Sequence, residues 1–133
     1  MSETIRYRVD PSLDVPPSRQ LTDAILDAVA TGAVGPGDKL PTVKGLAAEA
    51  LVNPNTAAKA YRMLQAEGVL IGRNGLGVFV ADGGPALARA ARGASTLAAF
   101  ERAALEALRA GNDPENLIRA IEAHCAATAG ENR

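Results

Sequence analysis

The fold of this chain is decided between residues 40 and 80, which read LPTVKGLAAEALVNPNTAAKAYRMLQAEGVLIGRNGLGVFV. Asn53 is a strong helix N-cap residue, and Pro54 falls at the first helical position, where its missing N–H costs nothing. The following helix has one buried face at helical spacing, formed by Ala57, Ala60, Tyr61 and Leu64. Its other face carries Asn55, Lys59 and Arg62 and no acidic residue before position 67. This second face is suited to hydrogen bonding with a negatively charged partner.

A β-hairpin is expected directly after this helix. Gly68 is placed to end the helix, and two short β-prone runs follow at 69–71 and 78–80. Asn74-Gly75 between them is the strongest short-range hairpin signal. Each signal alone is more often only a well-capped helix or a tight turn. Together and in this order they are typical of a winged helix-turn-helix, whose recognition helix reads the DNA major groove while the wing contacts flanking backbone.

The rest of the chain is expected to be helical, so the predicted fold class is mainly α with a small β-hairpin. Residues 5–9 suit a short strand or an extended arm. Pro16-Pro17-Ser18 is expected to open a first helix that Gly32 ends, and Thr42 is expected to be the N-cap of a second helix. Gly83-Gly84-Pro85 marks a linker into an alanine-rich helix over 86–110, with Gly93 a candidate break. A last helix is expected from about 114 to 128. We predict a DNA-binding domain over 1–82 and a helical dimerisation tail over 83–133.

Composition fits this organisation. The 133 residues are 47% hydrophobic but only 3% aromatic, which indicates an aliphatic core without a large aromatic-lined ligand pocket. The net charge of −1 is low for a DNA-binding protein. Residues 43–75 are nevertheless locally positive, because Lys44, Lys59, Arg62 and Arg73 outnumber Glu49 and Glu67. We therefore expect a local basic patch.

Other classes of protein are disfavoured. Cys125 is the single cysteine, so no intrachain disulfide can form, which suits a reducing cytosol. The first residues lack a signal-peptide pattern, and no apolar run is long enough to span a membrane. The single histidine, His124, adjoins Cys125, so a closed zinc site or a Cys–His nucleophile pair is not expected. The glycines at 72, 75 and 77 precede a strand where a phosphate loop needs a helix. We expect a cytoplasmic non-enzyme with no cofactor, no metal and no membrane association.

Residues 17–80 resemble the DNA-binding domain of the GntR family of bacterial transcription regulators. The matching landmarks are Gln20-Leu21, GAVGPGDKLP at 32–41, and the stretch from Glu67-Gly68 to the end of the hairpin at residue 80. VNPNT at 52–56 with Ala60-Tyr61-Arg62 is similar to the YtrA-like branch, whose members carry only a short C-terminal tail. The resemblance implies a dimeric operator-binding regulator, and this branch suggests control of a transport operon.

The chain departs from the family pattern at four positions. Lys44 stands where the family usually has arginine, and Thr42 where it has serine. Lysine keeps the charge but lacks the bidentate fork, so a phosphate contact is expected there. Leu51 stands at a common glycine, so this turn is either strained or differently shaped. Leu76 replaces a basic residue in the wing, for which Arg73 is the candidate compensation.

These observations give two sets of candidate site residues. The candidate DNA contacts are Thr42, Lys44, Asn53, Asn55, Thr56, Lys59, Arg62, Arg73, Asn74 and Gly75. The candidate dimerisation residues, at helical spacing in the tail, are Leu97, Phe100, Leu105, Leu108, Leu117, Ile118 and Ile121.

The predicted function is sequence-specific binding of a double-stranded DNA operator by a homodimer, most simply as a repressor. Two alternatives stay open: a winged-helix protein-interaction module that never binds DNA, and a tail that packs on its own winged domain. The sequence identifies no small-molecule effector.

Overall fold

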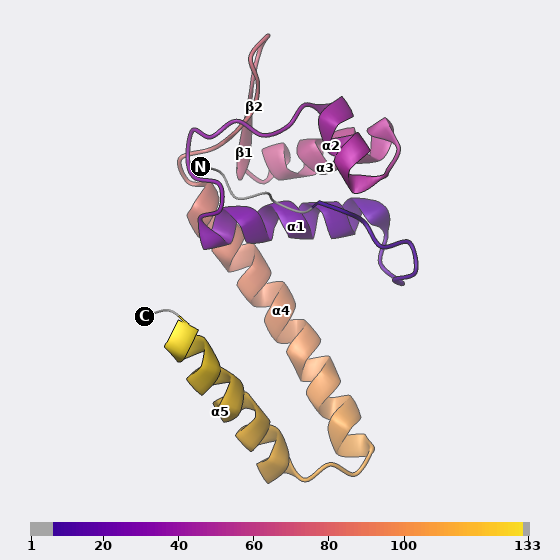
Figure 1. Ribbon diagram of the computed structural model, residues 1–133, viewed down its shortest axis with the longest axis vertical. Coiled ribbons are helices and arrows are strands. Elements are labelled where there is room, and N and C mark those ends of the chain that lie inside the picture. The colour runs from indigo at the N-terminus through magenta and orange to yellow at the C-terminus, as the bar shows by residue number, and fades with distance from the viewer. Residues whose placement is uncertain (1–6, 132–133) are drawn as a thin grey trace. The chain divides into compact units, whose positions relative to one another are not determined.

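The computed structural model describes residues 7–131, with side chains to residue 127 (Figure 1). In this part of the chain, five helices and one antiparallel hairpin follow one another in sequence. They are α1 (Pro17–Thr31), α2 (Val43–Ala50), α3 (Pro54–Ala66), β1 (Leu70–Arg73), β2 (Gly77–Val80), α4 (Gly84–Arg109) and α5 (Pro114–Glu131). The predicted fold class, mainly α with a small hairpin, is confirmed.

The chain forms two compact units, one ending at Gly93 and the other beginning at Ala94. Helix α4 runs through this boundary without interruption, so the candidate break near Gly93 is not present. A single glycine inside a helix costs about 1 kcal/mol relative to alanine, and the alanine-rich surroundings are strong helix formers. One glycine is therefore too weak a signal to end this helix.

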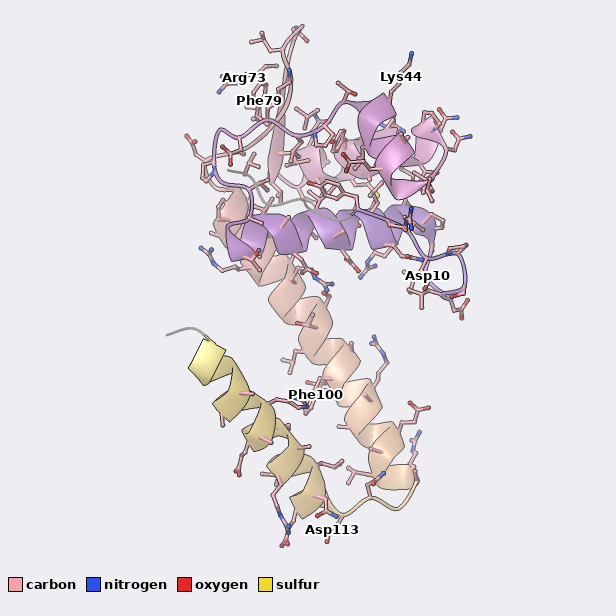
Figure 2. All side chains as sticks on the ribbon, in the orientation of Figure 1. Asp10, Lys44, Arg73, Phe79, Phe100 and Asp113 are labelled. Atoms are coloured by element: carbon pink, nitrogen blue, oxygen red, sulfur yellow. The ribbon has the colours of Figure 1, made fainter. Side chains whose placement is uncertain are left out.

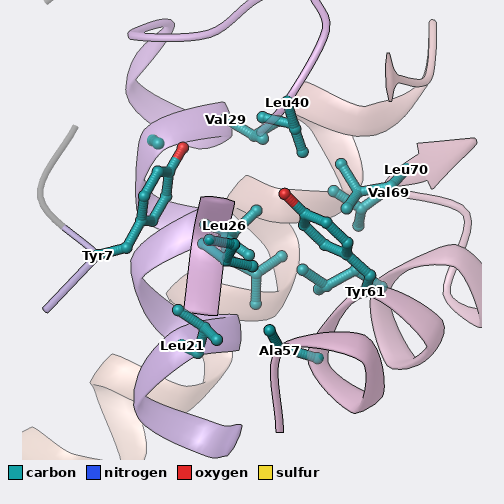
Figure 3. Packing of buried hydrophobic residues seen from close by; sticks show 14 of the residues in the cluster. Tyr7, Leu21, Leu26, Val29, Leu40, Ala57, Tyr61, Val69 and Leu70 are labelled. Carbon is teal, nitrogen blue, oxygen red and sulfur yellow. The ribbon is translucent and has the colours of Figure 1, made fainter. Parts of the chain in front are cut away.

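The core of the first unit is aliphatic and lies where α3 packs on α1 and α2 (Figure 3). Leu21 and Ile25 of α1, Leu46 of α2 and Leu64 of α3 are fully buried. Tyr7 and Val9 also reach this core, and the Val9 N–H donates to the Ala50 carbonyl at 3.2 Å. Residues 7–10 form an extended arm with no assigned strand, while residues 5 and 6 lie outside the described part.

The predicted helix caps are present. The Thr42 hydroxyl accepts from the Gly45 N–H at 3.0 Å, and the Asn53 side chain accepts from the Asn55 N–H at 2.8 Å. Gly68 follows α3 with φ 83°, and the N–H of Val69 bonds the Leu64 carbonyl at 3.0 Å. This is the Schellman arrangement, which satisfies carbonyls at the end of a helix.

The turn between α2 and α3 was predicted to be either strained or differently shaped at Leu51, and the structure shows the first. Leu51 has φ 60° and ψ 47°, the left-handed conformation, and it is the single non-glycine residue with positive φ among the described residues. The Val52 N–H then closes the end of α2 by bonding the Ala47 carbonyl at 3.0 Å. The glycine-type turn is therefore kept by a leucine, at the cost of backbone strain.

The hairpin pairs Leu70 with Val80 and Arg73 with Gly77. A third segment joins this sheet beside β2. The Leu40 N–H donates to the Val78 carbonyl at 2.9 Å, and the Val80 N–H donates to the Asp38 carbonyl at 3.0 Å. The wing is thus anchored to the segment that leads into α2.

Candidate nucleic-acid interface

Helix α3 buries one face and exposes the other, as its sequence predicts. Ala57, Ala60, Tyr61 and Leu64 are at most 2% exposed. Asn55, Lys59 and Arg62 are exposed, and Thr56 is half-buried beside them. The amphipathic pattern thus orients the helix so that its amide and cationic side chains remain available to a ligand.

A buried tyrosine fixes α3 against the start of α2. The Tyr61 hydroxyl donates to the Pro41 carbonyl at 2.6 Å, one residue before the α2 N-cap (Figure 3 shows Tyr61 in the core). Burial raises the pKa of Tyr61 well above its usual range, and the nearby Tyr7 and Glu49 add to the effect. Burial likewise raises the pKa of Tyr7 to about 12, helped by the Glu49 charge. Both phenols are therefore neutral near neutral pH, and the Tyr61 hydroxyl acts as a hydrogen-bond donor.

Two of the predicted DNA-contact residues also cap helices. The oxygen of Asn53 and the hydroxyl of Thr42 each accept from a backbone N–H within their own helix. Both side chains are exposed. A cap of this kind leaves a donor group on each side chain for a phosphate or a base, since an amide and a hydroxyl both donate as well as accept.

Lys44 projects from α2 on the side of the molecule toward which the hairpin also extends (Figure 2). It is exposed, and no ion pair holds it within the described residues. A lysine in this setting is free to neutralise a phosphate.

The wing carries an organised arginine. The Arg73 guanidinium lies over the Phe79 ring, 5.2 Å from its centroid (Figure 2). Such a stack restricts the guanidinium to one region of the strand surface. Asn74 and Gly75 form the exposed turn, in which the Leu76 N–H bonds the Arg73 carbonyl at 2.9 Å, and Leu76 is 60% exposed.

Sequence reasoning missed Lys39. This residue lies 31 positions before the start of the hairpin but pairs with Phe79, so its side chain joins the surface that carries Arg73. Only the long-range pairing of residues 38–40 with β2 reveals it. The usable signal was a lysine just before Leu40-Pro41, which alone is an ordinary surface residue.

The predicted dimerisation residues lie in the second unit, apart from the DNA-contact set along the chain. Six of them are large apolar side chains that are 43% to 56% exposed: Leu97, Phe100, Leu105, Leu108, Ile118 and Ile121. Leu117 is half-buried. Figure 2 shows Phe100 on the side of α4 that faces α5.

Among residues 7–127, whose side chains the structure describes, no group of three or more histidine, cysteine or acidic side chains is placed to hold a metal ion. No helix in the described part of the chain is long and apolar enough to cross a membrane.

Comparison with known proteins agrees with this geometry. Residues 17–80 match the family described as bacterial regulatory proteins, gntR family. The HTH-type transcriptional regulator Rv1152 of Mycobacterium tuberculosis is 36% identical over 96 residues, which cover 72% of this chain and 79% of that protein. The chain belongs to the GntR family. Its relatives are transcription regulators, and its winged helix is the DNA-binding fold of that family.

A further relative and two solved structures extend the likeness. The HTH-type transcriptional repressor YtrA of Bacillus subtilis is 35% identical over 75 residues, which cover 56% of this chain but only 58% of YtrA. A GntR family transcriptional regulator from Listeria monocytogenes shares the fold, with a TM-score of 0.71 and 24% identity over 86% of this chain and 97% of its own. The AraR DNA-binding domain in complex with operator ORE1 has a TM-score of 0.50 and 29% identity, covering 55% of this chain and 89% of that domain.

Proposed function

We propose that this protein is a sequence-specific repressor that binds a double-stranded operator as a homodimer in the cytoplasm and controls a small operon. The main support for the proposal is the exposed face of α3, because its side chains can bind the base edges and phosphates of DNA. An asparagine can pair bidentately with adenine, and Lys59 and Arg62 can neutralise phosphates. The repressor role draws support from the likeness to the repressor YtrA, and a transport-related target rests on that resemblance alone.

The homodimer is supported by the second unit. The six exposed apolar side chains on α4 and α5 exceed what a small helix pair usually leaves to water. A second copy would cover them through a closed two-fold interface. The two recognition helices, about 34 Å apart, would then bind half-sites separated by one turn of DNA. We accordingly propose residues 1–82 as the DNA-binding domain and 83–133 as the dimerisation tail.

A binding experiment tests the proposal. Full-length protein is titrated into a fluorescent duplex carrying the promoter of its own gene, and into an unrelated duplex of equal length, at two salt concentrations. Asn55→Ala should reduce the preference for the promoter. Lys59→Ala should weaken binding to both duplexes and reduce the magnitude of the salt slope by about one per chain, or about two for a bound dimer. Arg89→Ala, at an exposed position of α4, is the control for loss of one positive charge. If both α3 variants stayed within twofold of wild type, α3 would not be the recognition helix.

Absence of salt-dependent binding to either duplex would instead favour a winged-helix module that binds protein.

A further inference from the structure

Lys39 lies directly opposite Phe79 in the small sheet. The backbone bonds on either side of this pair, Leu40 N–H to Val78 and Val80 N–H to Asp38, make it a non-hydrogen-bonded pair of antiparallel strands. Side chains in such a pair are close and point to the same face of the sheet. Lys39 and Phe79 therefore share one surface.

The Lys39 side chain runs along β2 toward the hairpin turn. A Cβ placed on Gly77 would lie 3.0 Å from Lys39 Cε and 3.8 Å from its Nζ. Gly77 is two residues nearer the turn than Phe79, and the space over it is filled by the lysine stem. The missing side chain at this position thus makes room for Lys39, and φ of 120° also favours glycine there.

Arg73 runs in the opposite direction on the same face. It is paired with Gly77, yet its guanidinium lies 5.2 Å from the centre of the Phe79 ring. Lysine and arginine therefore pass each other along β2, and the ring of Phe79 and the backbone of Gly77 support them. Neither cation forms an ion pair among the described residues, and the Asp38 carboxylate is already bonded to the Gly35 N–H at 2.8 Å.

We propose that Lys39 is a DNA-backbone contact that acts with Arg73 as a two-cation clamp on phosphates beside the wing. The inference rests on the proposed function and adds a residue from outside the hairpin to the interface. Two like charges on one face repel each other, and an anion bound beside both offsets that repulsion. The anion repeated along the proposed ligand is phosphate. Lys39 then contributes affinity without sequence preference.

The experiment compares salt dependence between variants that each lose one charge. Lys39→Met keeps an unbranched stem over Gly77 and removes the ammonium, and Lys39→Arg restores a cation. Arg89→Met, at an exposed position of α4, is the matched control. Binding of full-length protein to the promoter duplex and to an unrelated duplex is measured by anisotropy across a salt series. Thermal unfolding of each variant establishes that it is folded.

Each lost phosphate contact reduces the magnitude of the slope of log K against log salt by about 0.9, so a dimer that loses one contact per chain should lose about 1.8. We expect this decrease for Lys39→Met on both duplexes, recovery of the slope in Lys39→Arg, and no change in Arg89→Met. A Lys39→Met slope equal to that of Arg89→Met would overturn the inference, and Lys39→Gln provides the same comparison if the methionine variant is unstable. If wild-type protein binds neither duplex, the proposed function itself is wrong, which is a separate outcome.

Discussion

Leu51 occupies a left-handed backbone position that glycine would adopt with less strain. The turn between α2 and α3 needs a left-handed residue, and Leu51 adopts it with φ 60° while its side chain is 68% exposed. Left-handed backbone costs a residue with a Cβ about 1–2 kcal/mol. Because the side chain is mostly in solvent, its removal loses little packing.

Leu51→Gly should therefore raise the free energy of unfolding by about 0.5–1 kcal/mol, after the entropy that glycine loses on folding is subtracted. Urea unfolding of the full-length protein measures this change. Leu51→Ala is the control, since alanine removes the same exposed side chain but keeps the strained backbone. A glycine variant no more stable than the alanine variant would show that the turn is not strained.

At the scale of secondary-structure elements, the Tyr61 hydroxyl links α3 to the segment just before α2. Tyr61→Phe removes its bond to the Pro41 carbonyl, so we expect a loss of about 1 kcal/mol in the free energy of unfolding. The variant should also change the response to alkali. Urea midpoints at several pH values around the ordinary tyrosine pKa, 10.0, measure both effects.

The direction of the pH effect follows from the raised pKa values of Tyr7 and Tyr61. Their contribution to stability is complete below the unfolded pKa of 10.0, and it is lost as the pH rises toward the folded value, about 12 for Tyr7. Wild-type stability should fall across this range because the unfolded phenols ionise first. Tyr61→Phe should lose less stability, since it has one such group fewer. Parallel pH profiles for the two proteins would contradict the burial of Tyr61.

Two glycines in α4 should respond oppositely to alanine. A Cβ on Gly84 would lie 2.6 Å from the Val69 carbonyl oxygen, whereas nothing lies within 4 Å of one on Gly93. Gly93→Ala should stabilise the protein by about 0.5–1 kcal/mol through helix propensity. Gly84→Ala should lower the melting temperature, because Gly84 is the first residue of α4 and the start of the helix must shift away from Val69 to admit a Cβ. Equal shifts in thermal unfolding would show that α4 does not approach the wing closely.

For the whole molecule, local chemistry was predictable from sequence and long-range pairing was not. Caps such as Asn53 and Gly68 act within a few residues, so their sequence signals sufficed. The sequence alone could not decide whether the turn at Leu51 is strained or differently shaped, because the packing of α2 on α3 selects its conformation. Lys39 was missed because its place on the wing depends on pairing with Phe79, forty positions later. The assignment of the DNA-contact and dimerisation residues stays a prediction, since each depends on a second molecule.

The proposed homodimer is most directly tested by changes in the tail. Leu108 and Ile121 are 44% and 43% exposed in one chain, and in the proposed dimer they are buried. Leu108→Glu with Ile121→Glu would place unpaired charge in that interface, so we expect monomers in sedimentation and weak operator binding. Arg102→Gln with Arg119→Gln changes the net charge equally and should remain dimeric.

A truncation that removes the tail should cut after Gly93, because Ala88 is fully buried in the first unit and Arg92 bonds Asp27 at 2.6 Å. A truncated protein that still sedimented as a dimer and bound the operator undiminished would refute the tail's role.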